Sequence, residues 1–416
     1  MSNGTVPVQV VTCDPSRREP GTIYITTRPG GLPTRAAFAW ILGIAQDGSI
    51  SLNREYAGTS QDIRCQPDGT ILFSQSAQGL INELDREGNI LRQWHARGKF
   101  LDKIPPQGST ELPVNFIHHT VNYMPNGNFL VLDAEARSFD NWHSSTSDRN
   151  APLQTADIVG DVITEVTRAG KVVNRYHILD MLDPYRATQS TLSGYWRKQG
   201  FPNGHDWCHC NAVTHDANDD TFLVSLRHQD CIVKFRRGSG DIVWILGNHS
   251  EWKKPWSDFL LTPDASVHWQ FHQHDCSVPA PNRVMCFDNG NYRAGAYQLP
   301  LPDPENYSRL VEFEVDPAAM CVRQVWSWGG PPQDSTYACY QGGAMRLPKT
   351  GNTFGTMGGI CFDKGVPTSN NDGSFGSARL IEVTPNGDVV FDMRIDDSAA
   401  AAPRAFSAFR ATHFPA

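Results

Sequence analysis

Three histidines in this 416-residue chain each precede a pattern typical of a strand, a turn and a second strand. They are His119 in HHTVNYMPNGNFLVLD, His209 in HCNAVTHDANDDTFLVS and His274 in HQHDCSVPAPNRVMCFDNG. If these patterns repeat around an axis, the three imidazoles converge on one point although dozens of residues separate them. Imidazole titrates near neutral pH and serves as acid, base, nucleophile or metal ligand, so this convergence predicts a catalytic site.

A fourth candidate, Arg227, lies in FLVSLRHQDCIVKF, near the end of the strand expected to pair with the His209 strand. Its guanidinium is permanently charged and presents a planar fork of donors, which matches a sulfate, a phosphate or a carboxylate. Such a cation favours an anion at the histidine site over a tightly bound metal. We therefore expect these residues to handle an anionic group.

The segment that ends at His274 keeps a metal site open as an alternative. His268, Gln270, His272 and His274 alternate, so on a regular strand they share one face, and His-x-His on a strand is a metal-ligand spacing. In this alternative, the ligands of a catalytic divalent cation are His119, His209, His272 and His274.

The elements that would position these residues form a repeat of four strands. Residues 62–96 show it most plainly, and Asp-Gly and Asn-Gly turns between alternating apolar residues mark the hairpins. About six such units fit along the chain, and helical periodicity is almost absent. We predict an all-β fold, a six-bladed β-propeller of four-stranded antiparallel blades, in which the first strand of each blade lies nearest the axis.

This architecture would form a single domain over residues 1–416, with a short irregular N-terminal segment over about residues 1–20. Residues 138–158 and 185–204 are longer than most connections, so we expect long inserted loops over one face, as lids or as decoration. Aromatic residues of the loops are candidate walls for an aromatic substrate: Trp142, Tyr195, Trp196, Trp252 and Trp256.

Two thiols, Cys208 and Cys210, flank His209. Strand alternation places both on the face opposite to His209 and Asn211. We therefore expect the thiols to pack between blades as small hydrophobic groups, not to bind a metal or act as nucleophiles. The ten cysteines include no Cys-x-x-Cys pair, so neither a disulfide framework nor a structural zinc site is predicted.

Composition excludes several classes of partner. The formal net charge is -8 and there is no long run of lysine and arginine, which argues against nucleic acid. The longest apolar stretch, residues 36–45, is about half of what a membrane span requires, and the amino terminus lacks the pattern of a secretory signal. We expect a cytoplasmic protein with no membrane partner, and the sequence leaves the oligomeric state open, a dimer included.

These motifs resemble the bacterial arylsulfate sulfotransferase family. The resemblance rests on HHTVNYMPNGNFLVL, DWCHCNAV, SLRHQDCIVKF, WQFHQHDCSV with FDNG, and RLPKTGNTF, which run in the family's order from about residue 110 to 360. It implies transfer of a sulfuryl group from a phenolic sulfate ester to a phenolic acceptor through a transient sulfohistidine. No nucleotide or other cofactor is required, and the sequence has no P-loop or dinucleotide-binding motif.

The resemblance also assigns roles by position. His274 would be the nucleophile, and His209, Arg227 and His119 would hold the sulfuryl oxygens and assist proton transfer. The residues beside them are expected to contact the substrate, namely Asn211, His118, His228, His272 and Gln273.

Two other functions compete with sulfuryl transfer. One is a metal-dependent lyase or hydrolase that acts on a small anionic aromatic or carboxylate substrate, with Arg227 holding the carboxylate. The other is a binding propeller without chemistry, although such a module has no reason to collect histidines at an axial mouth. A structural calcium ion in the axial channel is compatible with all three functions.

Overall fold

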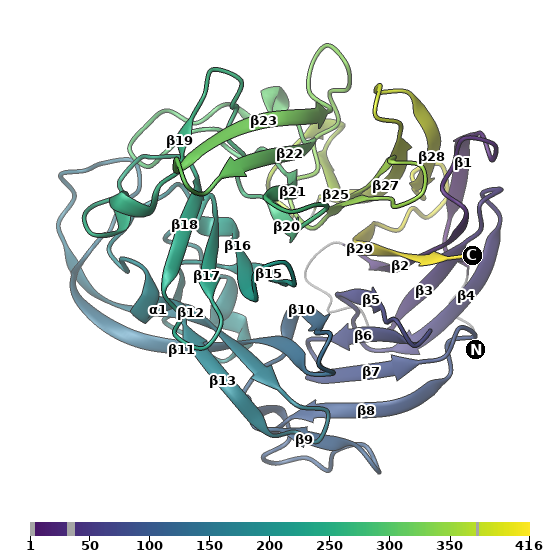
Figure 1. Cartoon of the computed structure of the whole chain (residues 1–416), viewed down its shortest axis with the longest axis horizontal. Coiled ribbons are helices and arrows are strands. Elements are labelled where there is room, and N and C mark those ends of the chain that lie inside the picture. Colours follow the sequence, from purple (N-terminus) through teal and green to yellow (C-terminus); the bar gives the residue numbers. More distant parts are fainter. Residues whose placement is uncertain (1–4, 31–37, 372–373) are drawn as a thin grey trace.

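The computed structural model describes residues 5–30, 38–371 and 374–416, and its regular structure is almost entirely β-strand (Figure 1). The strands form six sheets, built from antiparallel hairpins with a few short parallel additions. No helix of the described residues is long and apolar enough to span a membrane. The helical segments are α1 (Ile178–Met181), η1 (Arg97–Lys99), η2 (Tyr195–Gln199), η3 (Arg227–Gln229), η4 (Trp256–Phe259) and η5 (Asp303–Glu305).

Three of the sheets hold the first part of the chain together with its last strand. From the innermost strand outward, the first contains β29 (Phe406–Pro415), β2 (Gly21–Pro29), β3 (Phe38–Ile44) and β4 (Ile50–Ala57). The second contains β5 (Ile63–Cys65), β6 (Ile71–Gln75), β7 (Leu80–Leu84), β8 (Ile90–Ala96) and β9 (Thr110–Leu112). The third contains β10 (His118–Tyr123), β11 (Phe129–Trp142), β12 (Gln154–Val166) and β13 (Val172–His177), with β14 (His205–Asp206) beside β12.

The other three sheets hold the second half of the chain and its first strand. The fourth contains β15 (Cys210–Asp216), β16 (Thr221–Leu226), β17 (Cys231–Arg236) and β18 (Ile242–Gly247). The fifth contains β20 (His274–Ser277), β21 (Arg283–Asp288), β22 (Arg309–Asp316), β23 (Cys321–Trp328) and β19 (Thr262–Pro263). The sixth contains β24 (Gly343–Arg346), β25 (Thr353–Asp363), β27 (Phe375–Val383), β28 (Val389–Ile395) and β1 (Val8–Cys13), with β26 (Val366–Pro367) beside β25.

The sheets follow one another around a centre in Figure 1. Their innermost strands contact one another in chain order, from β5 through β10, β15, β20 and β24 to β29, and β29 in turn contacts β5. The ring therefore closes between the two ends of the chain: the last strand, β29, pairs with β2. His119, His209 and His274 each lie at or beside the start of an innermost strand.

The N-terminal segment differs from the irregular one that the sequence predicted. Residues 8–13 form β1, which pairs antiparallel with β28 and so covers the outer edge of the last sheet. Covering that edge satisfies backbone groups that would otherwise be open to another chain. Residues 1–4 of the segment lie outside the described residues.

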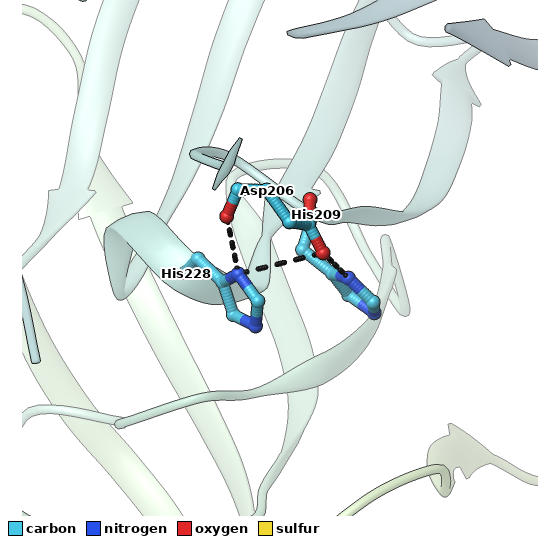
Figure 2. A group of neighbouring side chains, drawn as sticks. All are labelled: Asp206, His209 and His228. Atoms are coloured by element: carbon cyan, nitrogen blue, oxygen red, sulfur yellow. Dashed lines mark hydrogen bonds and ion pairs between the residues drawn. The ribbon is translucent and has the colours of Figure 1, made fainter. Parts of the chain in front are cut away.

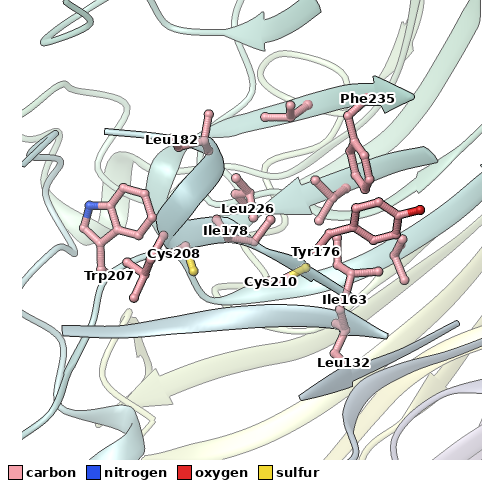
Figure 3. Close-up of a cluster of buried hydrophobic side chains, with 14 of the residues drawn as sticks. Leu132, Ile163, Tyr176, Ile178, Leu182, Trp207, Cys208, Cys210, Leu226 and Phe235 are labelled. Atoms are coloured by element: carbon pink, nitrogen blue, oxygen red, sulfur yellow. The ribbon is translucent and has the colours of Figure 1, made fainter. Parts of the chain in front are cut away.

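Apolar side chains fill the space between neighbouring sheets. Figure 3 shows one such cluster, in which Cys208 and Cys210 lie among Trp207, Leu226 and Phe235. Both thiols are fully buried there, which confirms the prediction that they pack as small hydrophobic groups. All ten cysteines are free.

The two predicted long loops differ from each other. Both ends of residues 138–158 are strand, because β11 and β12 stay paired from Phe129 opposite Val166 to Trp142 opposite Gln154, and residues 143–153 connect them. The pattern of exposed and less exposed side chains along this part of β11 alternates, as it does in a paired ribbon. Residues 185–204, by contrast, are irregular around the short helix η2 and reach the site described next.

Candidate functional site

A cavity of about 810 Å³ lies where strands β10, β15 and β20 begin. Its wall includes His119, His209, Arg227, His228 and His274. The ring centroids of His119 and His209 are 4.7 Å apart. The structure therefore brings together the four residues predicted to be catalytic and His228, one of the predicted substrate contacts.

An irregular backbone at the start of each inner strand aims these side chains into the cavity. His119 and His209 have φ angles of 50° and 47°, in the left-handed region that residues other than glycine rarely adopt. Register shifts follow in β10, β15 and β20, and Asp275 in the third of these strands has a φ of 66°. Such backbone conformations cost roughly 1–3 kcal/mol each and cluster at functional sites.

The same irregularity breaks the strand alternation that placed Asn211 on the face of His209. Asn211 and Gln273 do not line the cavity. The Asn211 side chain donates to the carbonyl oxygen of Gln273 at 2.7 Å. The Gln273 amide nitrogen donates to the carbonyl oxygens of Leu226 and Cys231. Both side chains therefore join neighbouring sheets, because the register shift in β15 turns Asn211 away from the face of His209.

The histidines before His274 do not share a face with it either. Strand β20 begins only at His274, so His268, Gln270 and His272 precede it in irregular chain. His272 is buried outside the cavity wall, with its Nε2 2.6 Å from Ser190 Oγ and its Nδ1 2.8 Å from Asp230 Oδ1. His118 is also absent from the wall and lies behind His119.

Asp206 orients two of the cavity histidines (Figure 2). Its Oδ2 lies 2.5 Å from His209 Nδ1, and its backbone oxygen accepts from His228 Nδ1 at 2.7 Å. Because both acceptors are oxygen atoms without a proton to donate, each Nδ1 carries the proton. His228 Nε2 then accepts from Arg227 Nη1 at 2.7 Å, and His209 keeps its Nε2 lone pair.

Asn289 fixes the proton of His274 in the same way. Its amide nitrogen donates to the carbonyl oxygens of Ala338 and Gln341 at 2.7 and 2.9 Å, which identifies the atom facing His274 Nδ1 as the amide oxygen. That oxygen lies 2.8 Å from Nδ1, so Nδ1 carries the proton and Nε2 has the lone pair. The backbone N–H of Gln341 donates to Nε2 at 3.2 Å, so this lone pair accepts a hydrogen bond.

The ring of His118 determines which nitrogen of His119 carries the proton. His118 Nε2 donates to the carbonyl oxygen of Asp133 at 3.2 Å, so neutral His118 has its lone pair on Nδ1. The two Nδ1 atoms of His118 and His119 are 2.9 Å apart, and the proton between them therefore belongs to His119. With His118 in this tautomer, the Nε2 of His119 is an acceptor, like that of His209 and His274.

Burial keeps these imidazoles neutral. It lowers the pKa of His119, His209, His228 and His274 well below the ordinary histidine value. The charge of Arg227 is the next largest cause at His209 and His274. At neutral pH the imidazoles therefore keep the lone pairs that a nucleophile or a base needs.

The cavity favours an anion. Arg227 lines it with one Nη2 contact to the carbonyl oxygen of Cys339 at 3.0 Å, and its Nε is buried without a hydrogen bond. Arg28 and Lys198 are also part of the wall, whereas no aspartate or glutamate is among the described residues that form it. A ligand that carries several oxygen acceptors would pair with these cations and meet no carboxylate.

The histidine quartet considered as a metal site is not assembled. Among the described residues, the group with ligand atoms close enough for a metal is Asp206, His209 and His228, which shares only His209 with that quartet. In this group the Nδ1 atoms of both histidines already hydrogen-bond to Asp206.

Two carboxylates near the centre of the ring could bind a calcium ion, but both pair with arginines. Arg410 on β29 contacts Asp62 Oδ1 at 3.0 Å and Asp275 Oδ1 at 3.3 Å. Arg64 contacts the same two aspartates at 3.1 and 3.4 Å. This network ties the inner strands β29, β5 and β20 together.

Aromatic side chains line the cavity beside the imidazoles. Tyr195 packs edge-on against His209 at 4.8 Å, and Phe409 packs 5.9 Å from His119 and 6.4 Å from His274. Of the loop aromatics considered as substrate walls, only Tyr195 belongs to the cavity wall. The others lie in hydrophobic clusters away from it: Trp142, Trp196, Trp252 and Trp256.

Sequence reasoning missed Asp206 and Asn289. Each stands beside a motif that the sequence makes visible, DWCHCN and FDNG, but an aspartate before a tryptophan or an asparagine in a turn does not by itself indicate a hydrogen bond to a histidine. Their role emerges only when distant segments are brought into contact.

Comparison with known protein families gives a match over most of the chain. A model of the arylsulfotransferase (ASST) family matches residues 46–405. The chain therefore belongs to the arylsulfotransferase family.

Two relatives carry the name arylsulfate sulfotransferase AssT. The one from Escherichia coli O6:H1 is 27% identical over 355 residues, which cover 75% of this chain and 54% of the relative. The one from Lelliottia amnigena is 27% identical over 256 residues, covering 50% of this chain and 42% of the relative. The match thus spans only about half the length of these relatives.

Solved structures are more distantly similar. A protein of unknown function from Bacteroides caccae has a TM-score of 0.38 at 13% identity, covering 76% of this chain and 97% of that one. A catalytically inactive virginiamycin B lyase from Staphylococcus aureus, with quinupristin, has a TM-score of 0.36 at 10% identity, covering 93% and 98% of the two chains.

Proposed function

We propose that this protein transfers a sulfuryl group from a phenolic sulfate ester to a phenolic acceptor, with His274 as the residue that carries the group. The observation that carries the proposal is the state of His274. Asn289 holds its proton on Nδ1, so Nε2 carries a lone pair, which accepts from the N–H of Gln341. The cavity also holds Arg227, three further imidazoles and, among the described residues, no carboxylate in the wall. Membership of the arylsulfotransferase family supports the same reaction.

The first half of the reaction sulfates His274. Nε2 attacks sulfur, the N–S bond forms, and the ester S–O bond breaks with its electron pair leaving on the phenolate. Arg227 holds the sulfuryl oxygens, where negative charge is spread during transfer. His209 offers an acceptor at Nε2 and assists proton transfer. The N–H of Gln341, which donates to Nε2 at 3.2 Å, gives up this hydrogen bond as the N–S bond forms.

The second half returns the histidine to its first state. The acceptor oxygen attacks the same sulfur, the N–S bond breaks, and its electron pair returns to Nε2. The acceptor's proton passes to His119, whose Nε2 is an acceptor. The transfer consumes no nucleotide and requires no metal or other cofactor.

We also infer the setting of this reaction. The six sheets and the closed ring of inner strands support a six-bladed β-propeller as the scaffold. Tyr195 and Phe409 offer aromatic surface beside the imidazoles, which suits a small phenolic substrate. Ten free cysteines support a reducing compartment such as the cytoplasm.

An assay of transfer tests the proposal. Protein incubated with 4-nitrophenyl sulfate and phenol should release 4-nitrophenolate and form phenyl sulfate, with the rate unchanged by a metal chelator. The His274→Ala variant should lose transfer. If only inorganic sulfate forms, or if chelation abolishes the activity, a metal-dependent hydrolase explains the protein better.

A further inference from the structure

A buried chain of polar groups continues behind His119, away from the cavity. His119 Nδ1 lies 2.9 Å from His118 Nδ1. On the far side of His118, Nε2 lies 3.2 Å from the carbonyl oxygen of Asp133 and 3.3 Å from Asp161 Oδ1. Two imidazoles thus connect a buried carboxyl group to the reaction cavity.

Asp161, at the end of this chain on β12, has one occupied and one open oxygen. Its Oδ2 accepts from Cys208 Sγ at 2.8 Å and from the backbone N–H of Cys210 at 2.6 Å. Its Oδ1 is buried and makes no hydrogen bond. The residue is only 1% exposed, so the open oxygen beside His118 is the place where a proton can be added.

Given the sulfuryl transfer proposed above, we propose that Asp161 stores the proton that the reaction moves, and that His118 passes it between Asp161 and His119. Two arrangements of one proton fit the observed distances. With Asp161 ionised, His118 Nε2 and His119 Nδ1 carry protons, and His119 Nε2 accepts from the acceptor. With Asp161 protonated on Oδ1, the ring protons lie on His118 Nδ1 and His119 Nε2, and His119 donates to the leaving phenolate.

The proton balance closes over one complete transfer. In the first half, the phenolate takes the Nε2 proton of His119, His118 Nδ1 gives its proton to His119 Nδ1, and Asp161 Oδ1 gives its proton to His118 Nε2. In the second half, the acceptor's O–H proton enters at His119 Nε2 and the same two links run in reverse. Asp161 ends protonated, as it began.

The surroundings of the Asp161 carboxyl group suit reversible protonation. Burial, and next the charge of Asp206, raise the pKa of Asp161 to about 8. Burial also lowers the pKa of His118 to about 4, so a proton does not remain on the linking ring. Trp196 packs edge-on over His118 at 5.0 Å and helps to exclude water.

The charged and titratable groups that face the chain come from several elements. Around Asp161 they are His118, Asp133, Asp206, Cys208 and Cys210. Around His118 and His119 they are Lys99, Asp206, His209, His274 and Arg410. Asp206 faces both ends, and its variant is therefore unsuitable as a control for the shuttle.

Two sulfate donors with different leaving groups test the proposal. 4-Nitrophenolate is a stable anion that leaves without a proton, whereas phenolate, with a conjugate-acid pKa of about 10, needs one. In Asp161→Asn, kcat/KM for phenyl sulfate should fall by on the order of 10²-fold, the usual contribution of a general acid, while kcat/KM for 4-nitrophenyl sulfate falls by less than about 3-fold. The wild-type rate with phenyl sulfate should decline above about pH 8, where the store empties, and the variant should lack this decline.

Matched variants separate the shuttle from a structural role. His118→Asn breaks the link and should show the same dependence on the leaving group, whether or not Asp161→Asn folds well. Glu165→Gln removes another buried carboxyl group of β12, which pairs with Arg237 and is not part of the polar chain behind His119. It should slow transfer from both donors by the same factor, if it slows either.

The outcomes distinguish the two proposals. If Asp161→Asn and His118→Asn slow both donors by the same factor, the shuttle is wrong and the sulfuryl transfer stands. If the wild-type protein transfers from neither donor, the proposed function itself is wrong.

Discussion

Two pairs of histidines in this protein lie beside a buried aspartate, but the aspartate takes a different position relative to the cavity in each pair. In the first pair, His209 and His228 stack at 4.6 Å and both bond to Asp206. In the second pair, His118 and His119 meet edge-on at 5.1 Å, and only the ring behind the cavity, His118, approaches a carboxyl group. The first arrangement holds cavity rings in place directly, whereas the second places one ring between the cavity and its carboxyl group.

This difference teaches that the position of a buried carboxyl group decides what a histidine beside it can do. A carboxylate bonded to a cavity imidazole fixes the tautomer and orientation of that ring. A carboxyl group one ring further away can exchange a proton with the cavity without contacting the substrate. The proposals above assign positioning to Asp206 and proton storage to Asp161.

The largest effect should come from breaking the first pair. Asp206→Asn can present an amide N–H to His209, which would shift that ring's proton to Nε2, while the backbone oxygen that holds His228 is unchanged. We expect kcat to fall on the order of 10³-fold for every donor, because a wrong tautomer removes the ring's function whatever the leaving group. Steady-state kinetics with 4-nitrophenyl sulfate and phenyl sulfate would measure it, and a loss confined to phenyl sulfate would contradict the positioning role.

A smaller effect should come from His274, whose Nδ1 faces the amide of Asn289 instead of a carboxylate. Asn289→Leu removes the acceptor of His274 Nδ1, so the nucleophile loses its fixed tautomer. We expect kcat to fall on the order of 10²-fold with 4-nitrophenyl sulfate. Asn122→Ala, which removes a side-chain bond to the carbonyl oxygen of Val213, is the control and should retain activity. A loss below about 3-fold in Asn289→Leu would show that His274 does not depend on this amide.

The smallest effect is on stability and compares the two buried carboxyl groups of β12. The pKa of Asp161 is raised to about 8, so the folded protein binds a proton that the unfolded chain releases above about pH 4, and stability falls as pH rises between these values. Asp161→Asn lacks this loss, and its Tm relative to wild type should rise by a few degrees between pH 5 and pH 8.

Glu165 should behave in the opposite sense. Burial alone would raise its pKa, but hydrogen bonds from Arg237 and Asn128 outweigh burial and lower it. Its contribution to stability is therefore present above the unfolded pKa and is lost as pH falls, so Glu165→Gln should cost more at pH 8 than at pH 4. Thermal unfolding across this range measures both variants, and parallel curves would contradict the assigned pKa shifts.

The sequence predicted the meeting of the cavity residues because it repeats. His119, His209 and His274 stand at equivalent places in successive hairpin patterns, and the turn chemistry of those patterns indicates where each inner strand begins. Arg227 and His228 follow because they close the hairpin that begins beside His209.

The sequence did not predict which neighbours face the cavity. Strict alternation assumes a regular strand, and the left-handed residues and register shifts at His119, His209 and Asp275 break it. Asn211 and Gln273 therefore became links between sheets. The contacts of Asp206 and Asp161 join segments that only the folded chain brings together, so no spacing in the sequence indicates them.

The most direct test of the central claim is the intact mass of the protein quenched after mixing with 4-nitrophenyl sulfate in the absence of an acceptor. The account predicts a mass increase of one sulfuryl group, located on His274 by peptide mapping under conditions that preserve N–S bonds, lost on addition of phenol and absent in His274→Ala. An unmodified protein that still forms phenyl sulfate, or a sulfuryl group on another residue, would contradict it.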